Sequence, residues 1–172
     1  KMPKMYFLFF IGLMFSSFFI AFGREKELIK FQLKNDCRKC NLQNVNFSGK
    51  DLSGVDFYLT NLKGANFSGA NLSGAYLSLS DLSGADLSRA NLSYANLSGS
   101  NLSGADLSNA NLSYANVSYS VLTGSNLFGA DLSNANFSGT SYLTKPIQKK
   151  LKRGNTMFCN TITPSGIENS GC

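Results

Sequence analysis

The 172-residue chain contains no histidine, and this absence limits what it can do. Histidine is the commonest general base in enzymes, so the usual means of proton transfer at neutral pH is missing. No glycine-rich phosphate loop interrupts the sequence. Serine is abundant, but it recurs at a fixed interval rather than beside a partner base. These absences favour a non-enzymatic protein with no catalytic residue, no cofactor and no metal site.

A strict five-residue repeat occupies the middle of the chain. Every fifth residue from Leu42 to Phe137 is Leu, Phe or Val, which makes twenty consecutive units. Ala and then Asn or Asp usually precede each of these central residues, and Ser commonly follows, as in residues 90–93 (Ala-Asn-Leu-Ser). An α-helix would space apolar positions at 3.6 residues and a strand at 2. The period therefore predicts a solenoid in which short extended pieces alternate with bends.

The exceptions to the repeat indicate how many units form one coil. The residue two places before the centre is usually Ala, but a hydroxyl replaces it at every fourth unit. We therefore expect a square coil of four units, with one unit on each side. A buried hydroxyl needs a partner, so each should bond a backbone carbonyl or its neighbour in the column. The column comprises Thr60, Ser80, Ser100, Ser120 and Thr140.

These units resemble the pentapeptide-repeat family, whose pattern is roughly Ala-(Asp/Asn)-Leu-x-x, and the resemblance covers residues 40–139. It implies an all-β fold, a right-handed quadrilateral β-helix of about five coils. The central residue and the residue two before it would then point inward. Lys50 departs from the pattern at an inward position, where its long stem allows the charge to reach solvent through the open end.

The N-terminus predicts export. Two lysines among the first four residues precede an uncharged apolar run over residues 5–22, and small residues stand near its end at Ala21 and Gly23. This pattern is typical of a signal peptide over residues 1–23, cut after Gly23. An uncleaved membrane anchor formed by residues 5–22 is the alternative. The expected location is therefore extracytoplasmic, either periplasmic or secreted, or else anchored at the membrane.

The remaining segments flank the repeats. Residues 24–39 would form an N-terminal cap or linker, residues 40–140 the β-helix, and residues 141–172 a basic C-terminal cap. Such caps cover strand edges that would otherwise stack end to end. Within the last segment, residues 145–153 fit a short helix with a proline in its first turn and Gly154 just past its end.

Four cysteines lie next to the repeats. In an exported chain they favour two disulfides. Proximity in the sequence favours Cys37–Cys40 and Cys159–Cys172, although three pairings are open. A four-cysteine zinc site and a thioredoxin-like interpretation of the first pair are weaker, because the two pairs flank opposite ends of the repeats and no βαβ context surrounds the first.

The net charge of +6 is unevenly distributed. Residues 40–140 carry six Asp against two Lys and one Arg, so the repeats have a charge of −3 and the flanks hold the excess of cations. The basic run at 145–153 is interpreted as the solvated face of a capping helix rather than as a site for nucleic acid or lipid.

The sequence favours an exported structural or protein-binding scaffold that presents flat, rigid faces. The candidate binding patch is Tyr94 stacked over Tyr114, with Tyr119 nearby on the adjoining side, because exposed aromatic residues are frequent binding anchors. The alternative is that an outer corner simply tolerates bulky residues. The expected partner is an unknown protein or envelope component rather than nucleic acid, and a membrane only if the N-terminal segment is uncleaved. An end-to-end or face-to-face homodimer stays open.

Two other functions are considered. Some members of the family mimic DNA and protect type II topoisomerases, but that role needs a cytoplasmic protein with a strongly acidic surface. A regular array of hydroxyls can also order water or ice, although the outward column here is rich in Ser rather than Thr. That column comprises Ser73, Ser93, Ser113 and Ser133.

Overall fold

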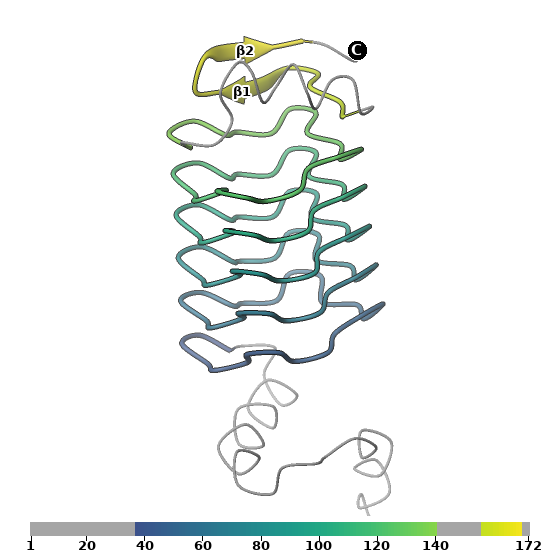
Figure 1. The fold of residues 1–172 in the computed structure, drawn as a ribbon, viewed down its shortest axis with the longest axis vertical. Coiled ribbons are helices and arrows are strands. Elements are labelled where there is room, and N and C mark those ends of the chain that lie inside the picture. Colours follow the sequence, from purple (N-terminus) through teal and green to yellow (C-terminus); the bar gives the residue numbers. More distant parts are fainter. Residues whose placement is uncertain (1–36, 141–155, 170–172) are drawn as a thin grey trace, which may run out of the picture.

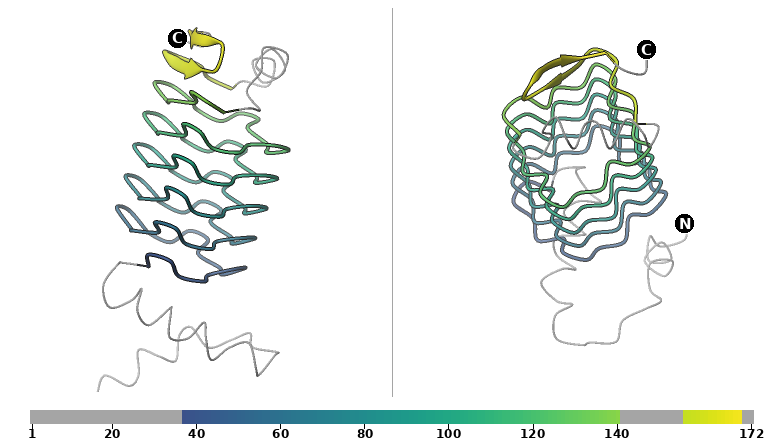
Figure 2. Two further views of the ribbon diagram at one scale, coloured as in Figure 1. Left: turned by 90° about the vertical axis from the view of Figure 1, so that its left-hand side faces the viewer. Right: turned by 45° about the horizontal axis from the view of Figure 1, so that its top comes forward.

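The chain winds into a stack of similar coils that together form a rod (Figure 1). The structure is a computed structural model that describes residues 37–140 and 156–169. Isolated parallel bridges join each side of a coil to the side four units further on, from Asn41↔Asn61 to Asn116↔Asn136. One coil therefore consists of four five-residue units, which form its four sides. In the tilted view, successive coils follow one another with the same outline (Figure 2, right).

Backbone hydrogen bonds join each side of a coil to the equivalent sides of its two neighbours. Asn91 donates its N–H to the carbonyl of Ala70 in the preceding coil, at 2.9 Å. Leu92 donates in the opposite direction, to Asn111 in the following coil, at 2.7 Å. Because the units are equivalent, the same pair of bonds recurs along the rod. The short extended pieces of the repeat thus form continuous parallel ladders.

A tight turn separates one side from the next. The carbonyl of each central residue accepts a hydrogen bond from the N–H three residues later, as from Ala95 to Leu92 at 3.0 Å. The residue two places after each centre has φ between 53° and 73°. Glycine and asparagine adopt this left-handed conformation most readily, which explains why they hold most of these positions.

The Asn or Asp before each central residue has a local role. Its side-chain oxygen accepts a hydrogen bond from the backbone N–H two residues later, as Asp86 Oδ1 does from Ser88 at 2.9 Å. Seventeen such bonds occur in the repeats. In the described coils, no inter-coil backbone bond uses that N–H, so the side chain satisfies a donor that the ladders leave over.

The rod has a filled core. Every central residue from Leu42 to Phe137 is at most 7% exposed, and the alanines two positions earlier are buried as well. Near the N-terminal end, the rings of Phe47 and Phe67 stack with centroids 5.4 Å apart. Lys50 is exposed, in agreement with its expected escape from the core.

The column of buried hydroxyls is arranged as predicted. Ser120 donates to the carbonyl of Leu97 at 2.7 Å, and Ser100 lies 3.4 Å from the Ser120 hydroxyl. Thr60, Ser80 and Thr140 each donate to a backbone carbonyl. The hydroxyls therefore replace alanine without leaving a buried donor unpaired.

Residues 156–169 rejoin the stack at its C-terminal end. Met157 bridges Asp131 and Ile162 bridges Asn136, so this segment is paired at a wider sequence offset than the regular coils. Strand β1 (Thr161–Thr163) continues the ladder, and β2 (Gly166–Glu168) pairs with it in an antiparallel hairpin. The repeat pattern predicted neither this return nor this hairpin.

Several predicted segments lie outside the described residues. They are the signal peptide or anchor (1–23), most of the N-terminal cap (24–36) and the basic helix (145–153). Within residues 37–140 and 156–169, no helix is long and apolar enough to cross a membrane.

Candidate binding surface

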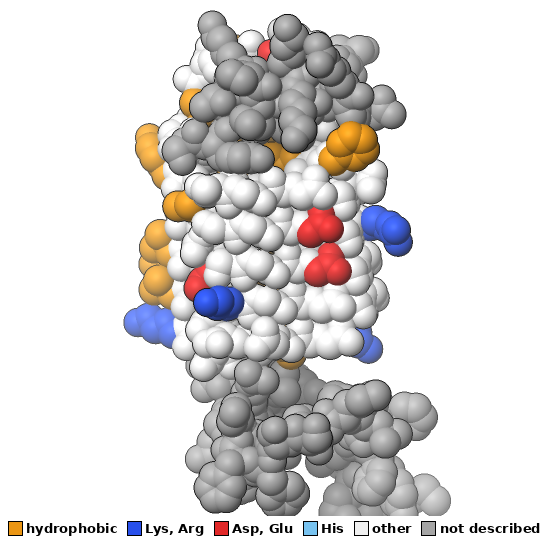
Figure 3. Space-filling model, in the orientation of Figure 1, with side chains coloured by type: hydrophobic (Ala, Val, Ile, Leu, Met, Phe, Trp, Pro, Cys, Tyr) orange, Lys and Arg blue, Asp and Glu red, His pale blue; other side chains and the backbone are white. Residues whose placement is uncertain are grey.

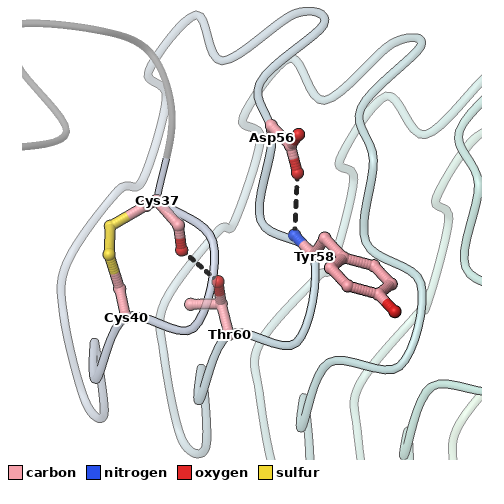
Figure 4. Close-up of a disulfide and its surroundings, with 5 residues drawn as sticks. All are labelled: Cys37, Cys40, Asp56, Tyr58 and Thr60. Carbon is pink, nitrogen blue, oxygen red and sulfur yellow. Dashed lines mark hydrogen bonds between the residues drawn. A yellow bond between two sulfur atoms is a disulfide. The ribbon is translucent and has the colours of Figure 1, made fainter.

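The first cysteine pair forms a disulfide at the N-terminal end of the core (Figure 4). Cys37 occupies a central position and Cys40 the inward corner position of the next unit, and both are buried. The bond spans one turn of the repeat, in which Cys40 donates its N–H to the carbonyl of Cys37 at 3.1 Å. The Thr60 hydroxyl in the next coil donates to the same carbonyl. The disulfide therefore replaces the apolar pair that lines the other corners.

The second cysteine pair is only partly described. Cys159 is disulfide-bonded. Cys172 lies outside the described residues, so the pairing Cys159–Cys172 stays a prediction. Within the described ranges, no group of Cys, Asp and Glu side chains is arranged to hold a metal ion.

One side of the rod gathers the tyrosine side chains. This side consists of residues 55–59, 75–79, 95–99, 115–119 and 135–139. The corner residues just before these segments, at positions 54, 74, 94, 114 and 134, form its second border. We call this side together with these corner residues the tyrosine face. All five tyrosines that the structure describes lie on it, and each is exposed. They are Tyr58, Tyr76, Tyr94, Tyr114 and Tyr119.

The three tyrosines of the predicted patch lie on the two borders of this face. The rings of Tyr94 and Tyr114 stack with centroids 4.9 Å apart and planes 4° apart. Each ring covers one flat surface of the other, and both side chains stay exposed to solvent. Tyr119 belongs to the other border and is 74% exposed. The tyrosine side chains on both borders combine an apolar ring with a polar hydroxyl, which suits contacts with a protein surface.

Two leucines extend the patch beyond the residues predicted from the sequence. Leu59 and Leu79 lie one coil apart in the same border column as Tyr119, and both are exposed. Leu79 reaches over Gly99 of the next coil, since a Cβ added at Gly99 would lie 2.7 Å from Leu79 Cδ2. Tyr119 covers Gly139 in the same manner. The four-unit interval that revealed the hydroxyl column would also have revealed these leucines.

The backbone conformation of the border residues is informative. Leu59, Leu79, Tyr94, Tyr114 and Tyr119 all have φ between 55° and 60°. For a residue with a Cβ this left-handed conformation costs about 1–2 kcal/mol relative to the right-handed one. Among the described residues that follow a central position by two places, Lys39 and Arg89 are the others, apart from Gly and Asn, that adopt it. Five large apolar side chains therefore occupy positions that the fold itself would fill better with glycine.

The outer positions of the tyrosine face carry no charged residue between residues 57 and 140. The charges of this side lie at its N-terminal end, where Asp56 forms an ion pair with Arg38 at 2.6 Å and the exposed Lys39 lies one coil before Leu59 in the border column. In the space-filling view, hydrophobic side chains follow the left edge of the rod while acidic groups lie on the front (Figure 3). Acidic residues of the repeats on the other sides are Asp51, Asp81, Asp86, Asp106 and Asp131.

Comparison with known families decides the identity of the fold. The family model described as pentapeptide repeats matches residues 36–74, 70–109 and 105–141, with eight copies. The chain belongs to the pentapeptide-repeat family. Proteins of this family form right-handed quadrilateral β-helices, in agreement with the predicted fold.

Solved pentapeptide-repeat structures are similar to this chain. A protein from the Arabidopsis thaliana thylakoid lumen is 36% identical, with a TM-score of 0.58 over 68% of this chain and 77% of its own. One from Nostoc PCC 7120 is 29% identical, with a TM-score of 0.52 over 74% and 91%. Full-length QnrB1, a plasmid-mediated fluoroquinolone resistance protein, is 22% identical, with a TM-score of 0.37 over 79% of this chain and 82% of its own. No curated protein matches the chain.

Proposed function

We propose that this pentapeptide-repeat protein is an exported, non-enzymatic scaffold that binds a protein or envelope component through its tyrosine face. The observation that carries the proposal is the set of five bulky apolar residues held in the left-handed conformation at the borders of one side, whose outer positions carry no charge between residues 57 and 140. Strained residues cluster at functional sites because selection for binding offsets their cost to stability. Clustered tyrosines on a rigid support are typical binding anchors.

The scaffold itself supports a non-enzymatic role. The central residues fill the interior, and the chain has no histidine to act as a general base. We further propose five full coils over residues 40–139, with residues 141–172 forming a C-terminal cap closed by a Cys159–Cys172 disulfide. A rod of this kind offers its partner a surface that changes little on binding, which reduces the entropy cost of association.

Export has three lines of support. The apolar run over residues 5–22 follows a basic start. The Cys37–Cys40 disulfide is of a kind that persists in oxidising compartments. The relative from Arabidopsis resides in the thylakoid lumen, which is also outside the compartment where proteins are made. We therefore propose an extracytoplasmic location, with the anchor over residues 5–22 as the alternative.

Capture from the native envelope tests the proposal. Tagged full-length protein is compared with the double variant Tyr94→Gly/Tyr114→Gly, because glycine fits φ near 60° and keeps the fold. The control is Arg89→Gly, which makes the same change at the same repeat position on another side. We expect the double variant to lose the captured component and the control to retain it. Equal capture by all three proteins would contradict binding through this face.

DNA mimicry is the main alternative function. It requires a strongly acidic surface, whereas residues 40–140 carry a net charge of only −3. A supercoiling assay with a type II topoisomerase and its inhibitor tests this alternative directly. Protection of the enzyme by the purified protein would overturn the proposal of an exported scaffold. A thermal-hysteresis measurement tests water ordering by the serine column in the same way.

A further inference from the structure

We infer that the C-terminal end of the rod binds a membrane surface, with the rod standing on the bilayer by that end. The inference goes beyond the proposed function, because it concerns the end of the rod rather than its tyrosine face. It does not depend on whether residues 1–23 are removed. It is carried by exposed apolar side chains that surround the C-terminal end of the described coils.

Each of the four sides carries one large exposed apolar side chain near this end. Val121, Met157 and Ile162 each bridge to a different ladder of the rod, and Phe128 lies on the fourth side. Ile167 pairs with Ile162 across the hairpin and adds a further apolar side chain. The exposed fractions of these five residues lie between 40% and 71%. We call them the apolar belt, and hydrophobic side chains are visible on both edges of the rod near this end (Figure 3).

The apolar belt departs from the repeat. Within residues 37–120, every large hydrophobic side chain that is exposed lies on the tyrosine face, so the other three sides have none there. Val121 occupies a position that usually holds Asn or Asp, and Phe128 one that usually holds Ser. Val121 therefore cannot make the bond by which Asn101, one coil earlier, accepts the N–H of Ser103. Apolar side chains thus stand where the repeat favours polar ones, which marks this end as an interaction surface.

The shape of the apolar belt favours a membrane over a protein partner. A folded partner with a flat surface contacts one or two sides of a rod, whereas the belt has residues on all four. A bilayer surrounds whatever enters it and contacts all sides together. Because adjacent strands are about 4.8 Å apart, the belt extends about 10 Å from the fifth coil to the outer strand of the hairpin. Apolar side chains enter the boundary between head groups and acyl chains to a similar depth, about 5–10 Å.

Charge at this end favours an anionic membrane surface. Beyond Asp106, the charged residues that the structure describes are Asp131 and Glu168. The chain leaves the described coils at Thr140 and rejoins them at Thr156, and the sequence between these two residues has five Lys and Arg and no acidic residue. The apolar belt makes the proposed contact. The excess of cations that the chain carries at this end sets the preference for anionic head groups.

Tryptophan fluorescence of the exported protein tests the contact. The chain has no Trp, so one introduced residue reports alone. On addition of vesicles of phosphatidylcholine and phosphatidylglycerol, the emission of Phe128→Trp should shift to shorter wavelength, and lipids with brominated acyl chains should quench it. Ser68→Trp is the matched control, three coils or about 14 Å earlier on the same side. Ser68 and Phe128 share one repeat position, and the backbone N–H of each donates to the Asn two residues before it. An absent shift at 128, or an equal shift at 68, would overturn the inference.

A variant that restores the repeat removes part of the apolar belt and keeps the fold. In Val121→Asn/Phe128→Ser, the new Asn can accept the N–H of Thr123, and Ser is the usual outward residue. This variant should bind the same vesicles about tenfold or more weakly in a flotation assay, because it buries less apolar surface in the bilayer. The control Tyr58→Ser/Tyr76→Asn makes changes at the same two repeat positions on the tyrosine face and should bind as the wild type does. Equal binding by the belt variant and the wild type would contradict the inference.

The outcomes separate this inference from the proposed function. Tyr94→Gly/Tyr114→Gly, the variant expected to lose capture of an envelope component, should still bind vesicles as the wild type does. A wild type that does not bind vesicles overturns the inference and leaves capture through the tyrosine face as a separate result. Equal weakening of vesicle binding by the belt variant and by its tyrosine-face control would show that apolar surface anywhere on the rod suffices, and would overturn the end-on arrangement.

Discussion

At the scale of the residue, each of the five repeat positions has a separate physical task. The inward positions fill the core, the left-handed position makes the turn, and the Asn or Asp satisfies a donor that the ladders leave over. Asn91 illustrates two of these tasks. Its backbone N–H donates to Ala70 in the preceding coil, and its side-chain oxygen accepts a hydrogen bond from the backbone N–H of Ser93 in its own coil. Tyr76 and Val121 lack the oxygen needed for this bond.

Truncation of a central side chain should be far more damaging than truncation of an outward one. Leu92 is fully buried and Ser93 is partly exposed. Leu92→Ala should lower the free energy of unfolding by about 2–5 kcal/mol, because it leaves a cavity. Ser93→Ala should be within about 0.5 kcal/mol of the wild type. Chemical denaturation measures both, and similar losses at the two positions would contradict the inward and outward assignment.

Asp51 gives the repeat a dependence on pH. Its carboxylate accepts the backbone N–H of Ser53 at 3.1 Å and the amide of Asn71 at 3.0 Å. The Ser53 bond chiefly holds the pKa of Asp51 below its usual value of 3.8. A lowered pKa in the folded state adds stability above pH 3.8 that is lost as the pH falls through the folded value. An NMR titration should place the Asp51 midpoint below 3.8, and Asp51→Asn should remove this acid-dependent term.

At the scale of the element, neighbouring coils are held together by contacts that repeat at every fourth unit. The hydroxyl column makes such contacts at Thr60, Ser100 and Ser120, and the Cys37–Cys40 turn begins the column at the N-terminal end. At the C-terminal end, Thr156 and Thr161 donate to the carbonyls of Leu127 and Leu132. The segment that returns to the stack therefore uses the same inward hydroxyls as the regular coils.

Sequence reasoning predicted the coil but missed this return, for a physical reason. The coil follows from periodicity, since twenty equivalent units must occupy equivalent places. Residues 156–163 keep only the five-residue spacing of Thr156 and Thr161 and the buried Phe158, and their wider offset from the last coil breaks the column pattern. The sequence predicted only the tyrosines of the patch on this face. Tyrosine at an outward position is unusual and therefore indicates a surface feature, whereas Leu59 and Leu79 have the same residue type as the core positions.

Substitutions at Ser100 test how tightly the coils fit. The Ser100 side chain is fully buried between coils and lies beside the Ser120 hydroxyl. Ser100→Ala should cost about 1 kcal/mol or less, because the smaller side chain fits and one weak hydrogen bond is lost. Ser100→Leu should cost about 1–3 kcal/mol or more through overpacking. Thermal unfolding monitored by circular dichroism distinguishes them, and a tolerated leucine would contradict the packed corner.

At the scale of the whole molecule, the repeats form one continuous core with no internal boundary. A single coil buries too little apolar surface to offset the entropy of ordering its backbone, so the coils stabilise one another. The proposed export then predicts a definite mature form. Intact-mass measurement should give a chain that begins near Arg24 and contains no free thiol. Recovery of an uncleaved protein with four reduced cysteines would contradict both export and the second disulfide.

The equivalence of the four sides has a consequence for how such a chain can change its length. A deletion of four consecutive units shortens the rod and leaves every later residue on its original side. A deletion of a single unit also keeps an apolar residue at every central position, but it rotates everything after it by a quarter turn. Losing one unit between Ser100 and Tyr114 would thus separate the two stacked rings onto different sides, and it would also move Ser120 away from the corner that Ser100 occupies. Insertions and deletions of whole units therefore change the side of the rod on which each later residue lies, while the central positions stay apolar.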